Sequence, residues 1–80
     1  MEIADAIKGM LTELRPEFDF ENSTDFIEDG LLDSFDIISL SSMLEEKFGI
    51  TIDGLDIVPE NYSTVDAIIE LVKKSGGKEN

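Results

Sequence analysis

The sequence predicts an all-α fold, a small antiparallel helical bundle of three main helices and one short helix. Apolar residues recur at helical spacing in three separate segments, and no remaining segment is long enough to build a sheet. A chain of 80 residues with 41% hydrophobic content can bury one simple core. We therefore expect one domain over residues 1–80, without internal repeats.

The first helix is expected between Glu2 and Arg15. Pro16 ends it, because a proline disfavours helical backbone in the residue before it. Gly9 lies inside the helix, where glycine costs up to about 1 kcal/mol relative to alanine. The apolar face is formed by Ile3, Ala6, Ile7, Met10, Leu11 and Leu14.

The segment from Pro16 to Leu32 has no helical pattern and predicts a long loop. Loops of about seventeen residues are uncommon in compact domains and tend to be functional or disordered. Phe18, Phe20 and Phe26 favour an ordered loop that packs over the bundle.

The central helix is expected to start at Ser34, directly after a loop that contains Gly30, and to run to Phe48. Asp33, Ser34 and Asp36 suit a helix start, because short side-chain oxygens accept hydrogen bonds from free amides and negative charge favours the positive end of the helix dipole. From its position alone, Ser34 could simply be a helix cap.

This helix has two apolar faces when its residues are turned about 100° per step. One is the core stripe of Ile37, Leu40, Leu44 and Phe48, with Ser41 pointing toward it. Phe35 and Ile38 lie on the opposite side, among Ser39, Ser42, Glu45 and Glu46. A second apolar face rimmed by acids favours a surface that meets other proteins. Two alternatives are that Phe35 and Ile38 pack under the long loop, and that the glutamates form a solvated face.

The central helix should end at a left-handed cap on Gly49. An extended Ile50-Thr51-Ile52 segment follows, and the residues from Leu55 to Val58 are expected to form one short helical turn. Ser63 and Asp66 resemble a capping box at the start of the last helix. The apolar stripe of this helix is formed by Val65, Ile68, Ile69 and Val72. Lys73 and Lys74 suit its C-terminus, where the helix dipole is negative. Residues 75–80 should be a frayed polar tail.

Composition excludes several classes of function. With 19 acidic and 6 basic residues the net charge is -13, which argues against binding nucleic acid or an anionic membrane. No cysteine is present, which fits a reducing compartment, and no segment approaches the roughly 20 apolar residues of a membrane span. We expect a cytoplasmic protein, a monomer, whose partners present basic patches.

The sequence has no histidine or cysteine to activate Ser34, so Ser34 is not expected to act as a nucleophile by itself. A function at this residue must then be modification by another enzyme. A phosphate ester on Ser34 would lie at the positive end of the helix, where Asp33 and Asp36 would oppose it unless a divalent ion screens them.

These residues resemble the phosphopantetheine attachment region of the acyl carrier protein family. The resemblance is carried by Asp29-Gly30-Leu31-Leu32, Asp33-Ser34-Phe35 and Leu44-Glu45-Glu46-Lys47-Phe48-Gly49-Ile50. It implies that a carrier protein synthase (phosphopantetheinyl transferase) uses magnesium to transfer 4′-phosphopantetheine from coenzyme A to Ser34. The arm would then hold acyl or aminoacyl groups as thioesters for fatty acid, polyketide or nonribosomal peptide biosynthesis, and the protein itself would be a non-catalytic carrier.

The resemblance also assigns the residues that meet partner enzymes. Asp33 and Asp36 would contact the synthase. The enzymes that load and process the cargo would read Phe35, Ile38, Ser42, Glu45 and Glu46, with basic residues of the partner steering the encounter.

The chain departs from fatty-acid synthesis members, which usually have leucine after the serine and acidic or larger apolar residues at the positions of Ser39, Ser41 and Ser42. Ser41 would narrow or polarise the space that a long acyl chain needs. The Asp-Ser-Phe triplet and the segment from Leu55 to Thr64 resemble D-alanyl and stand-alone peptidyl carriers. An aminoacyl cargo is therefore an alternative.

Two interpretations come from other classes. Asp25, Asp29, Gly30 and Asp36 occupy positions one, five, six and twelve of a calcium loop, but Ile27 at position three cannot bind a hard cation, and position twelve is not glutamate. The other is an acidic interaction module that uses Phe35 and Ile38 with Ser34 unmodified, which explains the charge but not the resemblance.

Overall fold

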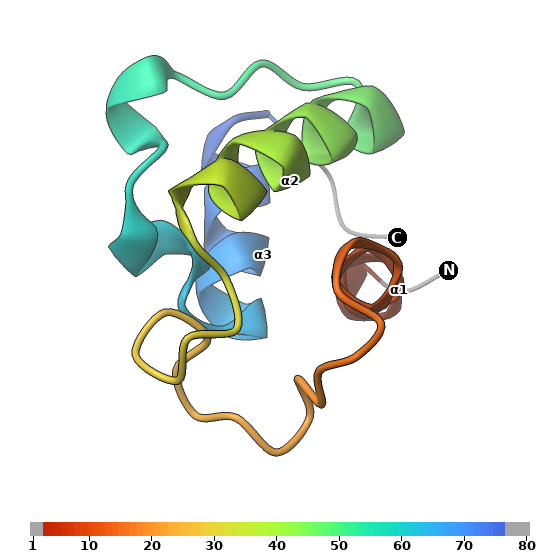
Figure 1. Cartoon of the computed structure of the whole chain (residues 1–80). Coiled ribbons are helices and arrows are strands. Elements are labelled where there is room, and N and C mark those ends of the chain that lie inside the picture. Colours follow the sequence, from red (N-terminus) through yellow and green to blue (C-terminus); the bar gives the residue numbers. More distant parts are fainter. Residues whose placement is uncertain (1–2, 77–80) are drawn as a thin grey trace.

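The computed structural model describes residues 3–76. Within them lie the α-helices α1 (Ile3–Leu14), α2 (Ser34–Phe48) and α3 (Val65–Lys74), and the short 3-10 helices η1 (Gly54–Asp56) and η2 (Pro59–Tyr62). Figure 1 shows α2 running across the view, with α1 seen nearly end-on. Helix α1 contacts both α2 and α3, and η2 packs against α2 and α3. No strand occurs in the described part of the chain, so the all-α class is confirmed.

The core lies where the three helices meet, and both predicted stripes on α1 and α2 point into it. The loop before α2 and the segment that follows α2 cover the sides of this core. The buried apolar side chains are Ile3, Ile7, Met10, Leu11, Phe20, Phe26, Leu32, Ile37, Leu40, Leu44, Ile50, Ile52, Tyr62, Ile68, Leu71 and Val72.

The loop between α1 and α2 is ordered around Phe26. The ring of Phe26 packs edge-to-face on Phe20, with 5.1 Å between centroids. Its backbone N–H donates to the Ser63 carbonyl at 2.7 Å, and its carbonyl accepts from the amides of Leu31 and Leu32 at 2.8 and 3.2 Å. The expectation of a packed loop is correct for Phe20 and Phe26, whereas Phe18 is 37% exposed. These bonds fix the path of the chain into α2.

The end of α2 follows the prediction. Gly49 has a φ of 64°, in the left-handed region, and its N–H donates to the Glu45 carbonyl. The Glu45 carboxylate accepts from the Ile52 amide at 2.9 Å, which ties the extended segment back to α2. Ile50 and Ile52 are buried, as expected.

The segment before α3 differs from the prediction. The helical turn expected from Leu55 to Val58 begins earlier, at Gly54, because the Asp53 side chain caps it by accepting from the Leu55 amide. A second turn, η2, starts at Pro59 and was not predicted. Together they replace the one short helix that we expected.

The predicted capping box at Ser63 and Asp66 is wrong by one residue. Thr64 is the N-cap of α3, and its hydroxyl accepts from the Ala67 amide at 3.0 Å. Ser63 has helical backbone angles because it closes η2, whereas an N-cap needs the extended backbone that Thr64 adopts. Lys73 and Lys74 lie in the last turn of α3 as expected.

Residues 77–80 of the expected tail lie outside the described residues. No helix in the described range 3–76 is both long enough and apolar enough to cross a membrane.

Candidate functional site

The first turn of α2 is held by a reciprocal capping box between Asp33 and Asp36. The Asp33 carboxylate accepts from the Asp36 amide at 2.9 Å, and the Asp36 carboxylate accepts from the Asp33 amide at 3.2 Å. Two amides that the helix itself leaves unpaired are satisfied in this way. The turn is thereby fixed without help from the serine between them.

Ser34 is the first residue of α2 and is exposed. Within residues 3–76 its hydroxyl forms no hydrogen bond, since the caps are supplied by Asp33 and Asp36. The interpretation of Ser34 as a helix cap is therefore wrong. Its hydroxyl is free for chemistry at the positive end of the helix.

Arg15, the residue after α1, contacts both acids of this turn. Its Nε donates to Asp36 Oδ2 at 3.0 Å, and its Nη2 lies 3.0 Å from the same oxygen. Nη2 is also 3.7 Å from Asp33 Oδ2, and Nη1 is 3.7 Å from a carboxylate oxygen of Glu17. The hydrogen bond and the charge of Asp36 raise the pKa of Arg15. Sequence reasoning missed this role, although Arg15 is the last residue before the proline that ends the first helix.

The two acids of the turn have different surroundings. Asp36 is 6% exposed, although the resemblance placed it at a surface that meets the synthase. Asp33 is exposed. The hydrogen bond from the Asp36 amide holds the pKa of the Asp33 carboxyl below its ordinary value, and the charge of Arg15 acts in the same direction. Asp33 is therefore a charged surface group next to Ser34.

The second apolar face of α2 is open. Phe35 is 75% exposed and Ile38 is 58% exposed, so neither packs under the loop, and that alternative is wrong. Ser42 and Glu46 are exposed, whereas Glu45 is half-buried because its carboxylate bonds the Ile52 amide. Leu55 on η1 is a further exposed apolar residue, at 85%. The face thus presents a bulky apolar pair next to Ser34.

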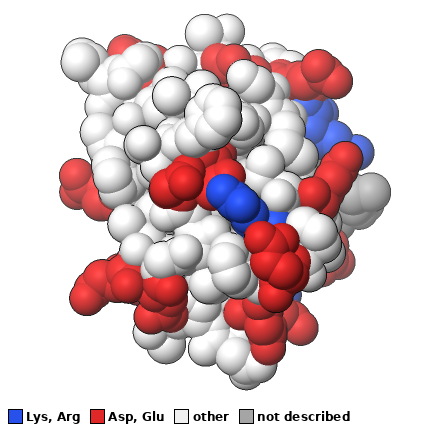
Figure 2. Space-filling model, in the orientation of Figure 1, with Lys and Arg blue, Asp and Glu red and all other residues white. Residues whose placement is uncertain are grey.

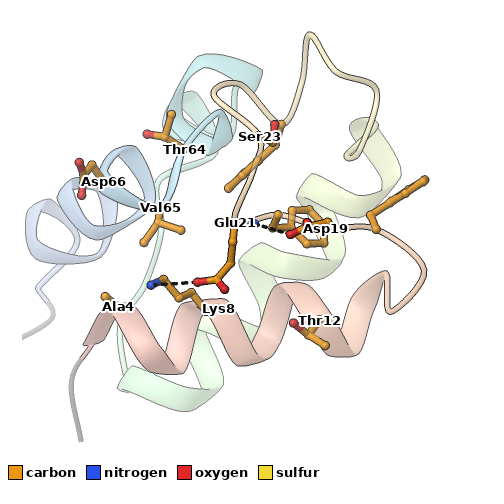
Figure 3. A pocket seen from close by; sticks show the side chains of 12 residues that line it. Ala4, Lys8, Thr12, Asp19, Glu21, Ser23, Thr64, Val65 and Asp66 are labelled. Carbon is orange, nitrogen blue, oxygen red and sulfur yellow. Dashed lines mark hydrogen bonds and ion pairs between the residues drawn. The ribbon is translucent and has the colours of Figure 1, made fainter.

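A groove of about 680 Å³ lies away from this face, between α1, the loop and the start of α3 (Figure 3). Lys8 and Glu21 form an ion pair of 3.7 Å at its edge. No residue of α2 lines it. The groove therefore does not include Ser34 or its neighbours.

Acidic side chains are spread over the face seen in Figure 2, with few basic ones among them. Within residues 3–76, no group of three His, Cys, Asp or Glu side chains is placed to hold a metal ion. The three carboxylates of the calcium-loop interpretation accept hydrogen bonds from the protein itself. Asp25 accepts from the Ile27 and Glu28 amides, Asp29 accepts from the Ser23 hydroxyl, and Asp36 accepts from Arg15. That interpretation has no support in the geometry.

A family model described as a phosphopantetheine attachment site matches residues 2–72, which include all of α2 and its first turn. No curated protein and no solved structure matches the chain.

Proposed function

Because the chain belongs to the phosphopantetheine attachment family of carrier proteins, whose members carry covalent 4′-phosphopantetheine, we propose that Ser34 is its attachment residue. The observation that carries the proposal is the unbonded, exposed hydroxyl of Ser34 in a turn whose caps are supplied by its neighbours. An attachment residue needs a hydroxyl that a second enzyme can reach without unfolding the helix. Ser34 meets that requirement.

The transfer from coenzyme A is a substitution at phosphorus. The Ser34 oxygen forms the new phosphate ester bond, the pyrophosphate bond of coenzyme A breaks, and adenosine 3′,5′-bisphosphate leaves with the electron pair. The hydroxyl proton passes to a base, which we assign to the synthase. Once attached, the arm supplies the thiol on which partner enzymes place and remove the cargo.

The docking surface proposed for partner enzymes is the outer face of α2, formed by Phe35, Ile38, Ser42, Glu45 and Glu46 together with Asp33. Exposed apolar side chains rimmed by acids suit a partner with an apolar recess inside a basic patch. Asp36 is buried, so we assign it to holding the turn rather than to direct contact.

An acyl group is the general cargo of the proposal, and one observation favours an aminoacyl or other small cargo. Ser41 and Tyr62, both buried, hydrogen-bond to each other on the core side of α2. Polar groups in that position disfavour insertion of a long apolar chain. A D-alanyl or peptidyl carrier is therefore the second candidate. The cytoplasmic location and the monomeric state stay predictions.

The test is the intact mass of the purified chain after incubation with coenzyme A, magnesium and a broad-specificity carrier protein synthase, followed by peptide mapping. We expect one phosphopantetheine group on the peptide that contains Ser34, and none on Ser34→Ala. Ser39→Ala, a serine change in the same helix, is the matched control and should be modified. Alanine is a good helix former and Ser34 is not the cap, so Ser34→Ala should keep the fold.

A folded wild-type chain that gains no mass would contradict the proposal and favour the acidic interaction module. Modification of Ser34→Ala would show that the assigned residue is wrong.

A further inference from the structure

The basic side chain of Arg15 lies against the first turn of α2. It makes two contacts of 3.0 Å with one oxygen of Asp36, from Nε and from Nη2. That same oxygen accepts the Asp33 amide, which is half of the capping box. The guanidinium, the buried carboxylate and the backbone of Asp33 thus meet at a single atom.

A buried carboxylate requires a compensating charge. Asp36 is 6% exposed, and removing a charge from water is costly unless it is paired and hydrogen-bonded. Arg15 supplies that pairing with the planar, multiply donating geometry that suits a carboxylate. Without Arg15, the buried Asp36 carboxylate loses the charged partner that compensates its burial and must turn toward water, which weakens its bond to the Asp33 amide.

We propose that Arg15 is a positioning residue for modification of Ser34, acting through Asp36 on the capping box that brackets the serine. The inference rests on the proposed function of Ser34. It assigns to the end of α1 a role in a reaction at the start of α2, and no contact between Arg15 and the coenzyme is required.

Charge alone predicts the opposite effect, which makes the inference testable. The chain carries a net charge of -13, and a basic synthase is attracted by it. Removing a positive charge should strengthen that attraction and lower KM. Loss of positioning should instead lower kcat, because the hydroxyl no longer sits in a fixed turn.

The experiment measures kcat and KM of a broad-specificity carrier protein synthase, with coenzyme A and magnesium, on the full chain and its variants. For Arg15→Gln we expect kcat/KM to fall about 10-fold or more, mostly through kcat, the size typical of lost positioning. Arg15→Lys keeps the charge and should recover part of the loss.

Lys8→Gln is the matched control, because it removes one positive charge from α1 at an ion pair with exposed Glu21. Its kcat should stay at the wild-type value, and its KM should stay or fall. All variants are assayed below their measured melting temperatures, so that an unfolded fraction does not mimic a catalytic loss. An Arg15→Gln variant with unchanged kcat, or with only a lower KM, would overturn the inference.

A double-mutant cycle tests whether Arg15 acts through Asp36. Asp36→Asn retains an oxygen that can accept the Asp33 amide but no longer carries a charge that needs Arg15. Arg15→Gln should therefore have little further effect in the Asp36→Asn background. An equal fold-loss in both backgrounds would show that Arg15 does not act through Asp36.

Failure of the proposed function is distinguishable from failure of this inference. If the wild-type chain is not modified, or Ser34→Ala is, the function of Ser34 is wrong. If the wild type is modified on Ser34 at a rate that Arg15→Gln matches, only the role of Arg15 is wrong.

Discussion

The hydroxyls of Ser41 and Tyr62 hydrogen-bond to each other inside the core, joining α2 to η2 across 21 positions of sequence. Ser41 Oγ also donates to the Ile37 carbonyl at 2.7 Å, so it accepts from the Tyr62 phenol. Tyr62 is fully buried and Ser41 is 4% exposed. Among the described residues no buried side-chain polar atom lacks a hydrogen-bond partner. The polar pair therefore fits inside the apolar core without an unpaired group.

The two members of this pair should respond unequally to mutation. Ser41→Ala leaves the buried Tyr62 hydroxyl without its partner, which should lower the free energy of unfolding by about 1–3 kcal/mol. Tyr62→Phe leaves Ser41 bonded to the Ile37 carbonyl and should cost only about 1 kcal/mol. Urea denaturation of both variants measures the difference. A larger loss for Tyr62→Phe would contradict the bonding scheme.

Tyr62 also predicts a loss of stability in alkali. Burial raises the pKa of Tyr62 above its ordinary value, so the folded chain holds the phenol proton more tightly than the unfolded chain does. Its contribution is complete below pH of about 10, the ordinary tyrosine pKa, and is lost as the pH rises through the folded-state pKa. Tyr62 is the single tyrosine of the chain, so the absorbance of phenolate reports on it alone.

The matched measurement compares the pH dependence of unfolding for wild type and Tyr62→Phe. Lysines titrate in the same range in both chains, so the difference between the two curves isolates the tyrosine. Ionisation of Tyr62 in the folded wild type at its ordinary pKa would contradict the prediction.

The three helices could be predicted from sequence because each buries one continuous stripe. The spacing of Ile3, Ile7 and Leu11 in α1, and of Ile37, Leu40 and Leu44 in α2, is set by the helix itself and needs no knowledge of the partner element. Gly49 was predictable for the same reason, since a glycine after the last apolar residue of a helix suits a left-handed cap.

The start of α3 and the partner of Asp36 depend on contacts far apart in the sequence. Ser63 and Thr64 are both able to cap a helix, and the choice falls on Thr64 because η2 uses the backbone of Ser63. Asp33 and Asp36 look alike in the sequence pattern. Asp36 is the buried one, and its partner Arg15 lies 21 positions earlier in the sequence. Rules based on neighbouring residues cannot predict a contact between residues so far apart in the sequence.

Two glycines should respond to alanine with opposite signs. Gly49 has a φ of 64°, where a side chain costs about 1–2 kcal/mol, so Gly49→Ala should lower the melting temperature. Gly9 lies within α1, and a Cβ there would meet nothing within 4 Å. Gly9→Ala should stabilise the fold by up to about 1 kcal/mol through helix propensity. Thermal unfolding followed by circular dichroism checks both. A shift in the same direction for the two variants would contradict these conformational assignments.

The exposed apolar pair on α2 should contribute to partner binding much more than to stability. Phe35→Ala and Ile38→Ala remove side chains that are 75% and 58% exposed, so each should change the free energy of unfolding by no more than about 0.5 kcal/mol. Each should reduce kcat/KM of an enzyme that loads or processes the cargo by about fivefold or more, as an interface anchor does.

Leu40→Ala is the control for this face, because Leu40 is fully buried in the same helix and its truncation should cost about 2–5 kcal/mol. A drop in the melting temperature of Phe35→Ala as large as that of Leu40→Ala would show that Phe35 packs in the fold. An unchanged kcat/KM of the loading or processing enzyme would remove Phe35 from the docking surface.

The excess of acids should make the fold more stable as salt increases. Charges separated by more than the Debye length, about 10 Å at 0.1 M salt, are largely screened. The radius of gyration is 11.4 Å, so much of the repulsion within a chain of net charge -13 acts over longer distances. Salt also weakens attractive pairs such as Lys74 with Asp56, at 2.8 Å, but exposed pairs contribute only about 0–1 kcal/mol each. The loss of repulsion should therefore dominate.

The melting temperature should rise between low salt and 0.1 M in sodium chloride and in potassium chloride alike, since screening does not depend on which monovalent cation is present. A constant or falling melting temperature would show that the ion pairs outweigh the repulsion, and a rise with one cation alone would indicate specific binding instead of screening.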